Sequence, residues 1–394
     1  MKSIAFIGAS EAHLDRARAL GYRIHLVQQA KNISTRLLAL ADDALLCDYE
    51  DPTNDAKVLA YLRASDALRP ICFKDEGLLP IGRYMDQLHG STSYSALAQA
   101  FTDKVKMREL LAGTALDNVA FQAIAHPHDL TLAARRLGFP FIAKPRFGVG
   151  SQGIKLVRTA GELEQLQLDD PYIAEQYIDG EEFSVESFSD GGRHTIHAIT
   201  HKLLFPGNGS QFVERGHQIS LDYNSGEQAQ GIHAAVQLFL DRIGMRDGVS
   251  HTELKVCNGQ VHIIESHNRA GGDSIPNLVL LSTGVDLFEL QIRQAAGDAV
   301  DTEARPLRCN AGVLFFDFKP GQMRYIAGVE RALLHPQVKN LYLPKMNGAE
   351  LKQPRSSFSR NGYVVGTAPT DSSVIALLQG VESSLLVRYE DTKN

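Results

Sequence analysis

The chain has few cysteines and no excess of positive charge, and these shortages exclude several classes of protein. Its 394 residues include four cysteines, none in a Cys-x-x-Cys pair, so we expect reduced thiols and neither a disulfide framework nor a zinc site. The net charge of −6 argues against nucleic acid as a partner, because phosphate binding requires a cationic surface. No apolar run is long enough to span a bilayer, and the N-terminus lacks a secretory signal. These features predict a cytoplasmic protein with neither a membrane nor a nucleic acid as partner.

Two further absences concern chemistry. The N-terminal pattern of strand (residues 4–7), helix (11–20) and strand (23–27) predicts a parallel sheet. It contains no Gly-x-Gly-x-x-Gly, which argues against a dinucleotide-dependent oxidoreductase. The chain also has no Met-Lys-Met segment of a biotin carrier, so a carboxylase with this sequence would need a separate biotin-carrier partner. Its length indicates two or three domains.

The most informative segment that is present runs from residue 141 to 157. An apolar strand ends in Lys144, a loop follows with Gly148, Gly150, Ser151 and Gly153, and residues 154–157 alternate like a second strand. Glycine lets the backbone approach a ligand closely, and successive N–H groups can hold phosphate oxygens. A Walker A or dinucleotide loop runs into a helix instead. The pattern therefore predicts a glycine-rich hairpin that covers phosphates.

Lys144 is the stronger of two candidate phosphate contacts. A lysine at the end of an apolar strand is out of place without a partner. Lys104 lies on a predicted helix (94–111), where a lysine is more often simply solvated. Glu175 and Glu182 flank a short linker after a predicted strand (172–177), and both suit an adenine amino group or ribose hydroxyls. The alternative interpretation, paired surface acids, applies most to Glu181 and Glu186.

Two more glutamates lie on a predicted hairpin (250–265). A loop centred on Gly259 would put Glu253 directly opposite Glu265, whereas a two-residue turn at Asn258 and Gly259 would put them on opposite faces. Like charges opposed on a sheet repel, and a divalent cation between them would remove the repulsion. Oxygen ligands beside a phosphate site favour Mg²⁺. The alternative is a pair of solvated carboxylates.

Two polar segments complete the candidate site. The run after the hairpin contains His267, Asn268, Arg269, Gly271 and Gly272, and a polar, glycine-rich run after a buried strand is typical of a site loop. Arg269 could hold a carboxylate or phosphate with two hydrogen bonds. The alternative is a tight surface turn with an exposed arginine.

The segment from residue 202 to 216, with residues 206–210 rich in glycine, predicts a mobile loop. The neighbouring Glu214, Arg215 and His217 suit the ammonium and carboxylate groups of an amino acid. We expect no metal at His194, His197 and His201.

The order of these motifs resembles the ATP-grasp superfamily over most of the chain. It runs from Asp103-Lys104 through the glycine hairpin and residues 175–186 to Glu253 and Glu265-x-x-x-Arg269. Within the superfamily, residues 212–217, 269–273 and 360–366 are similar to the L-amino acid ligases. The resemblance implies a mixed α/β and α+β fold. It would comprise an N-terminal Rossmann-like domain (1–95), linker helices with an ATP-grasp lid (96–178) and a C-terminal catalytic subdomain (179–394).

Roles follow from the resemblance position by position. Lys104 and Lys144 would contact ATP phosphates under a lid of residues 148–153. Glu175, Tyr177 and Ile178 would lie at the adenine, and Glu182 at the ribose. Glu253 and Glu265 would bind Mg²⁺, with His267 or Asn268 as third ligand where the family has asparagine two residues after the second glutamate. Arg269 would steady the acyl phosphate, and the residues left for substrate are Glu214, Arg215, His217, Gly271 and Gly272.

The implied activity is an ATP-dependent ligase that joins a carboxylate to an amine through an acyl phosphate. ATP and Mg²⁺ would be the cofactors, with two metal ions and Mn²⁺ as a substitute, and a homodimer would suit the family. The product would be an amide between an amino acid and another amino acid or a small carboxylic acid. The alternatives are an ATP-grasp carboxylase or purine-pathway ligase, and a nucleotide-binding protein without catalysis.

Overall fold

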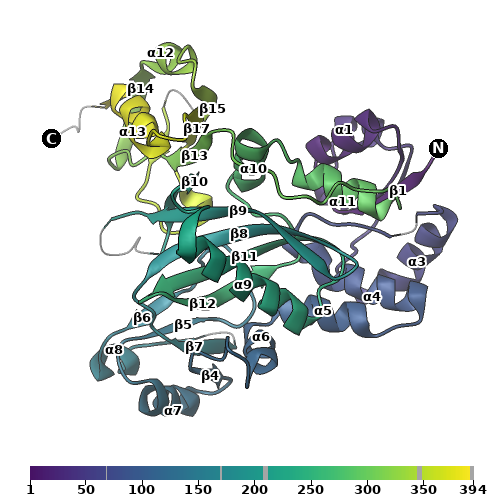
Figure 1. The fold of residues 1–394 in the computed structure, drawn as a ribbon, viewed down its shortest axis with the longest axis horizontal. Coiled ribbons are helices and arrows are strands. Elements are labelled where there is room, and N and C mark those ends of the chain that lie inside the picture. The colour runs from purple at the N-terminus through teal and green to yellow at the C-terminus, as the bar shows by residue number, and fades with distance from the viewer. Residues whose placement is uncertain (68, 169–170, 207–211, 344–347, 391–394) are drawn as a thin grey trace.

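Four β-sheets organise the part of the chain that the structure describes (Figure 1). The computed structural model describes residues 1–394 apart from 68, 169–170, 207–211, 344–347 and 391–394. The glycine-rich part of the predicted mobile loop, at residues 207–211, therefore lies outside the described residues. The division at residues 95 and 178 stays a prediction.

The N-terminal sheet has three parallel strands in the order β1-β2-β3. This confirms the predicted strand–helix–strand start. Among residues 70–73, only Ile71 pairs with this sheet, through a single parallel bridge to Phe6. The elements are β1 (Ser3–Ile7), α1 (Glu11–Ala19), β2 (Arg23–Gln28), α2 (Thr35–Leu40), β3 (Asp43–Leu46), α3 (Asp55–Ala64), η3 (Asp75–Gly77) and α4 (Leu78–His89).

The predicted continuous helix over residues 94–111 is two helices, α5 (Ser93–Thr102) and α6 (Lys104–Leu111). The break is at Asp103, which has extended backbone angles and accepts hydrogen bonds from the N–H groups of Val105 and Lys106. This side chain caps α6. Asp103 also holds Arg146 through two hydrogen bonds of 2.7 and 2.6 Å. The break thus fixes Lys104 beside the loop that follows Arg146.

A four-stranded antiparallel sheet carries the glycine hairpin, in the order β4-β7-β5-β6. Its elements are β4 (Phe121–Ile124), α7 (Pro127–Leu137), β5 (Phe141–Pro145), β6 (Lys155–Val157), α8 (Ala160–Glu164) and β7 (Tyr172–Gln176). Phe141 pairs with Val157 and Ala143 with Lys155. The predicted hairpin is confirmed, and its loop spans residues 146–154.

An eight-stranded sheet forms the centre of the molecule, in the order β12-β11-β8-β9-β10-β13-β17-β15. Helix α9 covers one face, where Val236 and Phe239 pack against Phe183 and Leu254. Helix α10 covers part of the other, where Leu278 and Val279 join a second core. The strands are β8 (Glu181–Asp190), β9 (Arg193–Leu204), β10 (Glu214–Ile219), β11 (Gly248–Cys257), β12 (Gln260–His267), β13 (Asn310–Phe315), β15 (Val338–Tyr342) and β17 (Tyr363–Ala368), and the helices are α9 (Gly226–Ile243), α10 (Ile275–Thr283) and α11 (Leu287–Ala295).

The C-terminal part adds a small sheet in the order β16-β14-β18. Its elements are β14 (Gly321–Ala327), α12 (Val329–Leu333), β16 (Glu350–Leu351), η4 (Ser357–Ser359), α13 (Val374–Ser384) and β18 (Leu386–Tyr389). No single helix in the described part of the chain is long and apolar enough to cross a membrane. Helices α10 and α11 pass that test of length and composition only as a pair, which bends by 97°.

Candidate active site

Glu253 and Glu265 face each other across β11 and β12. The turn between these strands has two residues, since Cys257 pairs with Gln260, and a regular ladder from that turn would pair Glu253 with residue 264. A β-bulge shifts the register by one residue, so that Leu254 pairs with Ile263 but Glu253 pairs with Glu265. The facing acids predicted for a loop centred on Gly259 are therefore present, although the turn is the two-residue one.

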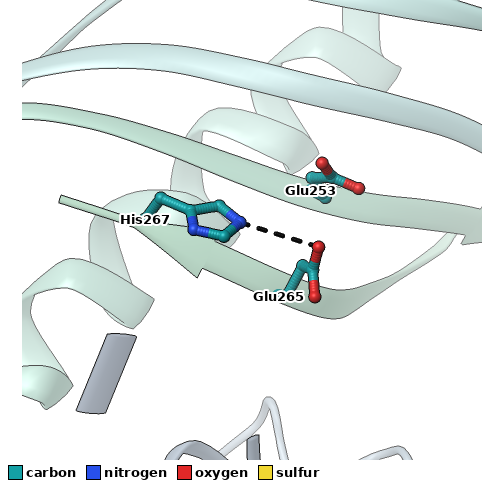
Figure 2. Close-up of side chains that lie close together, drawn as sticks. All are labelled: Glu253, Glu265 and His267. Carbon is teal, nitrogen blue, oxygen red and sulfur yellow. Dashed lines mark ion pairs between the residues drawn. The ribbon is translucent and has the colours of Figure 1, made fainter. Parts of the chain in front are cut away.

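His267 joins the two glutamates to form a candidate metal site. Within the described residues, one ligand atom from each of Glu253, Glu265 and His267 lies within 4.8 Å of the others. Figure 2 shows His267 and Glu265 on one strand and Glu253 on its neighbour, with the imidazole Nε2 3.6 Å from Glu265 Oε1. Two carboxylates and an imidazole are a suitable donor set for a divalent ion. The residues present therefore fit a bound metal.

Asn268 is not part of this group. It lines a different cavity, between helices α4, α5 and α11 and the ends of β8 and β11, and its side-chain oxygen is buried without a hydrogen-bond partner. Successive residues along an extended strand point to opposite sides, and β12 ends at His267. Of the two candidates for third ligand, the structure brings His267 to the glutamates and turns Asn268 away.

Both predicted lysines reach this site. Lys104 Nζ lies 3.1 Å from Glu265 Oε2 and donates to the carbonyl of Gly148, at 2.9 Å. Lys144 Nζ lies 2.8 Å from Glu175 Oε2 and donates to the carbonyl of Ile264 in the bulge, at 3.3 Å. Lys104 thus connects the glycine loop with β12, and Lys144 connects Glu175 with β12.

Glu175 holds Lys144 in place through this ion pair. It also accepts from Arg108 Nε at 2.7 Å, and all three side chains are buried. Burial alone would raise the pKa of Glu175, but the charges of Arg108 and Lys144 overcome it and lower the pKa to about 2. The carboxylate predicted for the adenine is therefore engaged by two cations.

A pocket of about 830 Å³, solvent-open space included, lies between the four-stranded sheet and β11–β12. A pocket of this size can hold a small-molecule cofactor. Its lining contains most of the residues predicted for the nucleotide: Lys104, Lys144, Gly148, Ser151, Glu175, Tyr177, Ile178, Glu182, Glu253 and Glu265. Gly150 and Gly153 lie outside it. Gly150 lines a second pocket, and a side chain at Gly153 would collide with Pro145.

Lys202 belongs to the site although the sequence analysis did not select it. Its Nζ lies 2.6 Å from Glu253, 3.3 Å from Glu182 and 3.6 Å from Glu214. Burial would lower the pKa of Lys202, but these carboxylates raise it well above the usual value. Its local signal in the sequence is weaker than that of Lys144, because the strand before it is rich in His and Thr and only Leu203 and Leu204 follow it.

A second pocket adjoins the first and shares Val149, Ser151, Glu253 and Glu265 with it. The two pockets therefore meet at the facing acids. The predicted substrate residues Glu214, His217, Arg269, Gly271 and Gly272 line the second pocket, together with Asp75, Lys202, Asp273, Ser357, Phe358 and Arg360.

Asp75, at the start of η3, ties the N-terminal part of the chain to this pocket. It accepts two hydrogen bonds from Arg269, at 2.8 and 2.6 Å, and lies 3.0 Å from His267 Nδ1. Burial would raise the pKa of Asp75, but His267 and Arg269 hold it well below the usual range. No spacing pattern connects residue 75 with residues 267 and 269, so sequence reasoning missed it.

Asp273 plays a similar part on the opposite side. Its carboxylate lies 3.0 Å from His217 Nε2 and accepts two hydrogen bonds from Arg360, whose guanidinium group lies 3.5 Å from the centre of the Phe315 ring. Glu214 Oε2 accepts a hydrogen bond from Ser357 Oγ at 2.8 Å. The C-terminal part of the chain therefore forms this wall of the pocket.

Arg215 is not brought to the pocket, which corrects the sequence prediction. Its guanidinium group lies 2.8 Å from Glu382 on α13. A bulge between Glu214 and Gly216 shifts the pairing of β10 with β9, and Glu214 and His217 both line the pocket. Arg215, at the bulge, contacts the C-terminal helix instead.

His251 and Glu186 form a chain of contacts that ends at Glu253. The His251 Nδ1 atom contacts Glu186, and its Nε2 lies 3.2 Å from Glu253 Oε1. Burial would lower the pKa of His251, but Glu186 and Glu253 raise it to about 9. The Gly271 N–H donates to Glu186 at 3.1 Å. A Cβ atom at Gly271 would lie only 2.7 Å from His251, so this close approach requires glycine.

Comparison with known proteins matches two parts of the chain to families. Residues 163–277 match the ATP-grasp domain, and residues 314–390 match the L-amino acid ligase C-terminal domain 2. The chain has the ATP-grasp fold. The crystal structure of L-amino acid ligase from Bacillus licheniformis superimposes with a TM-score of 0.83, covering 99% of each chain at 21% identity. The resemblance and the fold class predicted from the sequence are thus confirmed.

Curated relatives of this chain are longer than it is. It is 25% identical to the uncharacterized protein y4rH of Sinorhizobium fredii, over 72% of this chain and 60% of that protein. It is 25% identical to the arginine-specific carbamoyl phosphate synthase large chain of Bacillus subtilis, over 52% of this chain and 20% of that one. It is 24% identical to human carnosine synthase 1, over 74% of this chain and 39% of that protein. The chain therefore spans less than two thirds of the length of each.

Proposed function

We propose that this protein is an ATP- and Mg²⁺-dependent carboxylate–amine ligase that forms an amide bond through an acyl phosphate. The observation that carries the proposal is the position of Glu253 and Glu265 on the border between two pockets. On one side are the two lysines and the glycine loop; on the other are Arg269 and Glu214. A phosphoryl group transferred from one pocket to the other would pass these acids.

The first pocket would hold ATP. Lys104 and Lys144 would offset phosphate charge, and the N–H groups of the glycine loop would surround the phosphates. Glu253, Glu265 and His267 would hold the divalent ion, which supplies positive charge that neutralises the phosphate oxygens. Tyr177 and Ile178 would lie along the base, with Glu182 toward the ribose.

The second pocket would hold the substrates. A substrate carboxylate oxygen attacks the γ-phosphorus, the bond to ADP breaks, and an acyl phosphate forms. The amine nitrogen then attacks the acyl carbon, phosphate leaves, and the nitrogen loses a proton. Arg269 would bind the carboxylate and the acyl phosphate, while Glu214 and His217 would bind an ammonium or carboxylate group of an amino acid. Catalysis would rest on positioning and charge neutralisation.

The similarity of the C-terminal residues 314–390 to an L-amino acid ligase domain supports amino acids as substrates. We therefore propose that an amino acid is joined to another amino acid or to a small carboxylic acid. A second candidate is an ATP-grasp carboxylase or purine-pathway type ligase. The similarity to carbamoyl phosphate synthase over 52% of the chain supports this second candidate.

We propose that the same protein is cytoplasmic and homodimeric, with the three-part division at residues 95 and 178. Light scattering of the purified protein measures the mass of the assembly in solution, and a monomer at working concentration would contradict the dimer.

The test is phosphate release with ATP and Mg²⁺ over pairs of amino acids and small acids, with mass spectrometry of the products. A ligase of the proposed type releases phosphate only with a productive pair and yields a condensed product. Release with bicarbonate or formate would support the second candidate instead. ADP binding without phosphate release in any combination would indicate a non-catalytic nucleotide-binding protein. Glu265→Gln serves as the inactive control.

A further inference from the structure

The imidazole of His267 is held in one orientation by a carboxylate from a distant part of the chain. Its Nδ1 atom lies 3.0 Å from Asp75 Oδ1. This nitrogen therefore carries the hydrogen atom and donates a hydrogen bond to the carboxylate. In the neutral ring the lone pair then belongs to Nε2. Asp75 is itself fixed by two hydrogen bonds from Arg269, at 2.8 and 2.6 Å. The ring therefore has little freedom to turn.

The lone pair of Nε2 is directed at the facing acids. Nε2 lies 3.6 Å from Glu265 Oε1, the contact that the dashed line in Figure 2 marks. Lys104 pairs with the other oxygen of the same carboxylate at 3.1 Å. The His267 side chain is only 7% exposed, so solvent separates these groups poorly. Two electron-rich atoms that approach each other in a buried place are stable when a cation lies between them.

We propose that His267 Nε2 is a direct ligand of the divalent ion, that Asp75 is its positioning residue, and that the site therefore binds Mn²⁺ more tightly than Mg²⁺. The inference rests on the proposed function and deepens it, since it concerns the metal of the same site. Mg²⁺ prefers oxygen ligands and octahedral geometry, whereas an imidazole ligand shifts the preference toward divalent transition ions. A histidine that donates its other ring N–H to a carboxylate is the usual arrangement of such ligands.

The experiment measures metal binding directly, with ADP present and no acceptor substrate. Protein labelled with ¹⁵N-histidine is titrated with Mn²⁺ while electron paramagnetic resonance reports the free ion, and Mg²⁺ is then added as competitor. Pulsed resonance on the bound Mn²⁺ detects coupling to ¹⁵N, which the nucleotide cannot supply. We expect a ¹⁵N coupling and an affinity for Mn²⁺ at least about tenfold above that for Mg²⁺.

Three variants separate the ligand from its support. His267→Asn, which offers an amide oxygen, should lose the ¹⁵N coupling and most of the preference for Mn²⁺. Asp75→Ala should weaken Mn²⁺ binding by about 10- to 100-fold, and Asp75→Asn, whose amide oxygen can accept from Nδ1, should restore part of it. Arg269→Gln leaves the Asp75 and His267 side chains in the protein, so it should keep the coupling and weaken Mn²⁺ binding less than Asp75→Ala does. ADP affinity and thermal unfolding show whether each variant is folded.

The result that overturns the inference is a wild-type protein whose bound Mn²⁺ shows no ¹⁵N coupling, or a His267→Asn variant with an unchanged ratio of Mn²⁺ to Mg²⁺ affinity. Either result rejects it even if the protein is an active ligase. Conversely, the coupling is measured without turnover, so a failure to find amide products leaves the metal result standing and rejects only the proposed function.

Discussion

The ammonium group of Lys202 lies 2.6 Å from the carboxylate of Glu253, in a position where the lysine side chain is only 2% exposed. Glu182 and Glu214 also contact this lysine, and Glu265 faces Glu253 across the strands. One buried cation therefore offsets much of the negative charge that gathers where the two pockets meet.

Removal of this cation should destabilise the protein strongly. Lys202→Met leaves buried carboxylates without their counter-charge, and we expect a loss of about 3–5 kcal/mol in the free energy of unfolding. Urea denaturation measures it. Lys352→Met is the matched control, because Lys352 pairs with Glu350 at 2.9 Å but both side chains are more than half exposed, where a pair contributes at most about 1 kcal/mol. Equal effects of the two changes would contradict the importance of burial.

Lys144 should be essential for ATP consumption. Lys144 lines the pocket proposed for the nucleotide, and loss of one charged donor at a developing phosphate charge typically costs about 10²- to 10³-fold in turnover. Lys144→Ala should therefore abolish most ADP formation in a coupled assay, while circular dichroism shows a folded protein. Lys155→Ala changes an exposed lysine of the same hairpin and should leave turnover unchanged.

Acid stability should depend on Glu175. Its pKa of about 2 in the folded protein lies below the value of 4.5 for an unperturbed glutamate. A lowered pKa stabilises the folded state at pH above 4.5, and this contribution disappears as the pH falls toward 2. The shift corresponds to about 3 kcal/mol. We expect Glu175→Gln to destabilise the protein at pH 7 and the gap from wild type to narrow below pH 4.5. Chemical denaturation across this range measures the gap, and a constant gap would contradict the assignment.

Two adjacent residues of β10 should behave differently. Glu214 lines the pocket proposed for the substrates, so Glu214→Ala should raise the KM for one substrate or change the order of preferred substrates. Arg215 pairs with Glu382 outside that pocket, so Arg215→Ala should leave the substrate profile unchanged and affect only stability. Steady-state kinetics over the same substrate panel compares the two. A changed profile in Arg215→Ala would show that its guanidinium group reaches the substrate.

The parts of the site that sequence reasoning found are those with local signals. The hairpin of residues 141–157 has its lysine, glycines and alternation within one short stretch. The polar loop after β12 follows directly on a buried strand. For Glu253 and Glu265, alternation identified two acids but could not fix the register of their strands. Whether the two acids face each other depends on a bulge at Ile264, and no residue type in the sequence predicts that bulge. Bulges move side chains between faces without a change in composition.

The parts that were missed depend on contacts between distant segments. Asp75 is 194 positions from Arg269 along the chain, and Lys202 is 51 positions from Glu253, so no periodicity relates either pair. Asp103 broke the helix predicted at 94–111 because its side chain caps the second half. Arg215 was selected for its charge alone, and the bulge in β10 gave it a different neighbour.

The wall of the substrate pocket is completed late in the chain. Ser357 reaches Glu214 across 143 positions, and Arg360 reaches Asp273 across 87. During synthesis, these acids are made long before the groups that engage them. Residues 357–360 therefore complete this pocket, and exchanging them between related proteins would alter which molecules enter it.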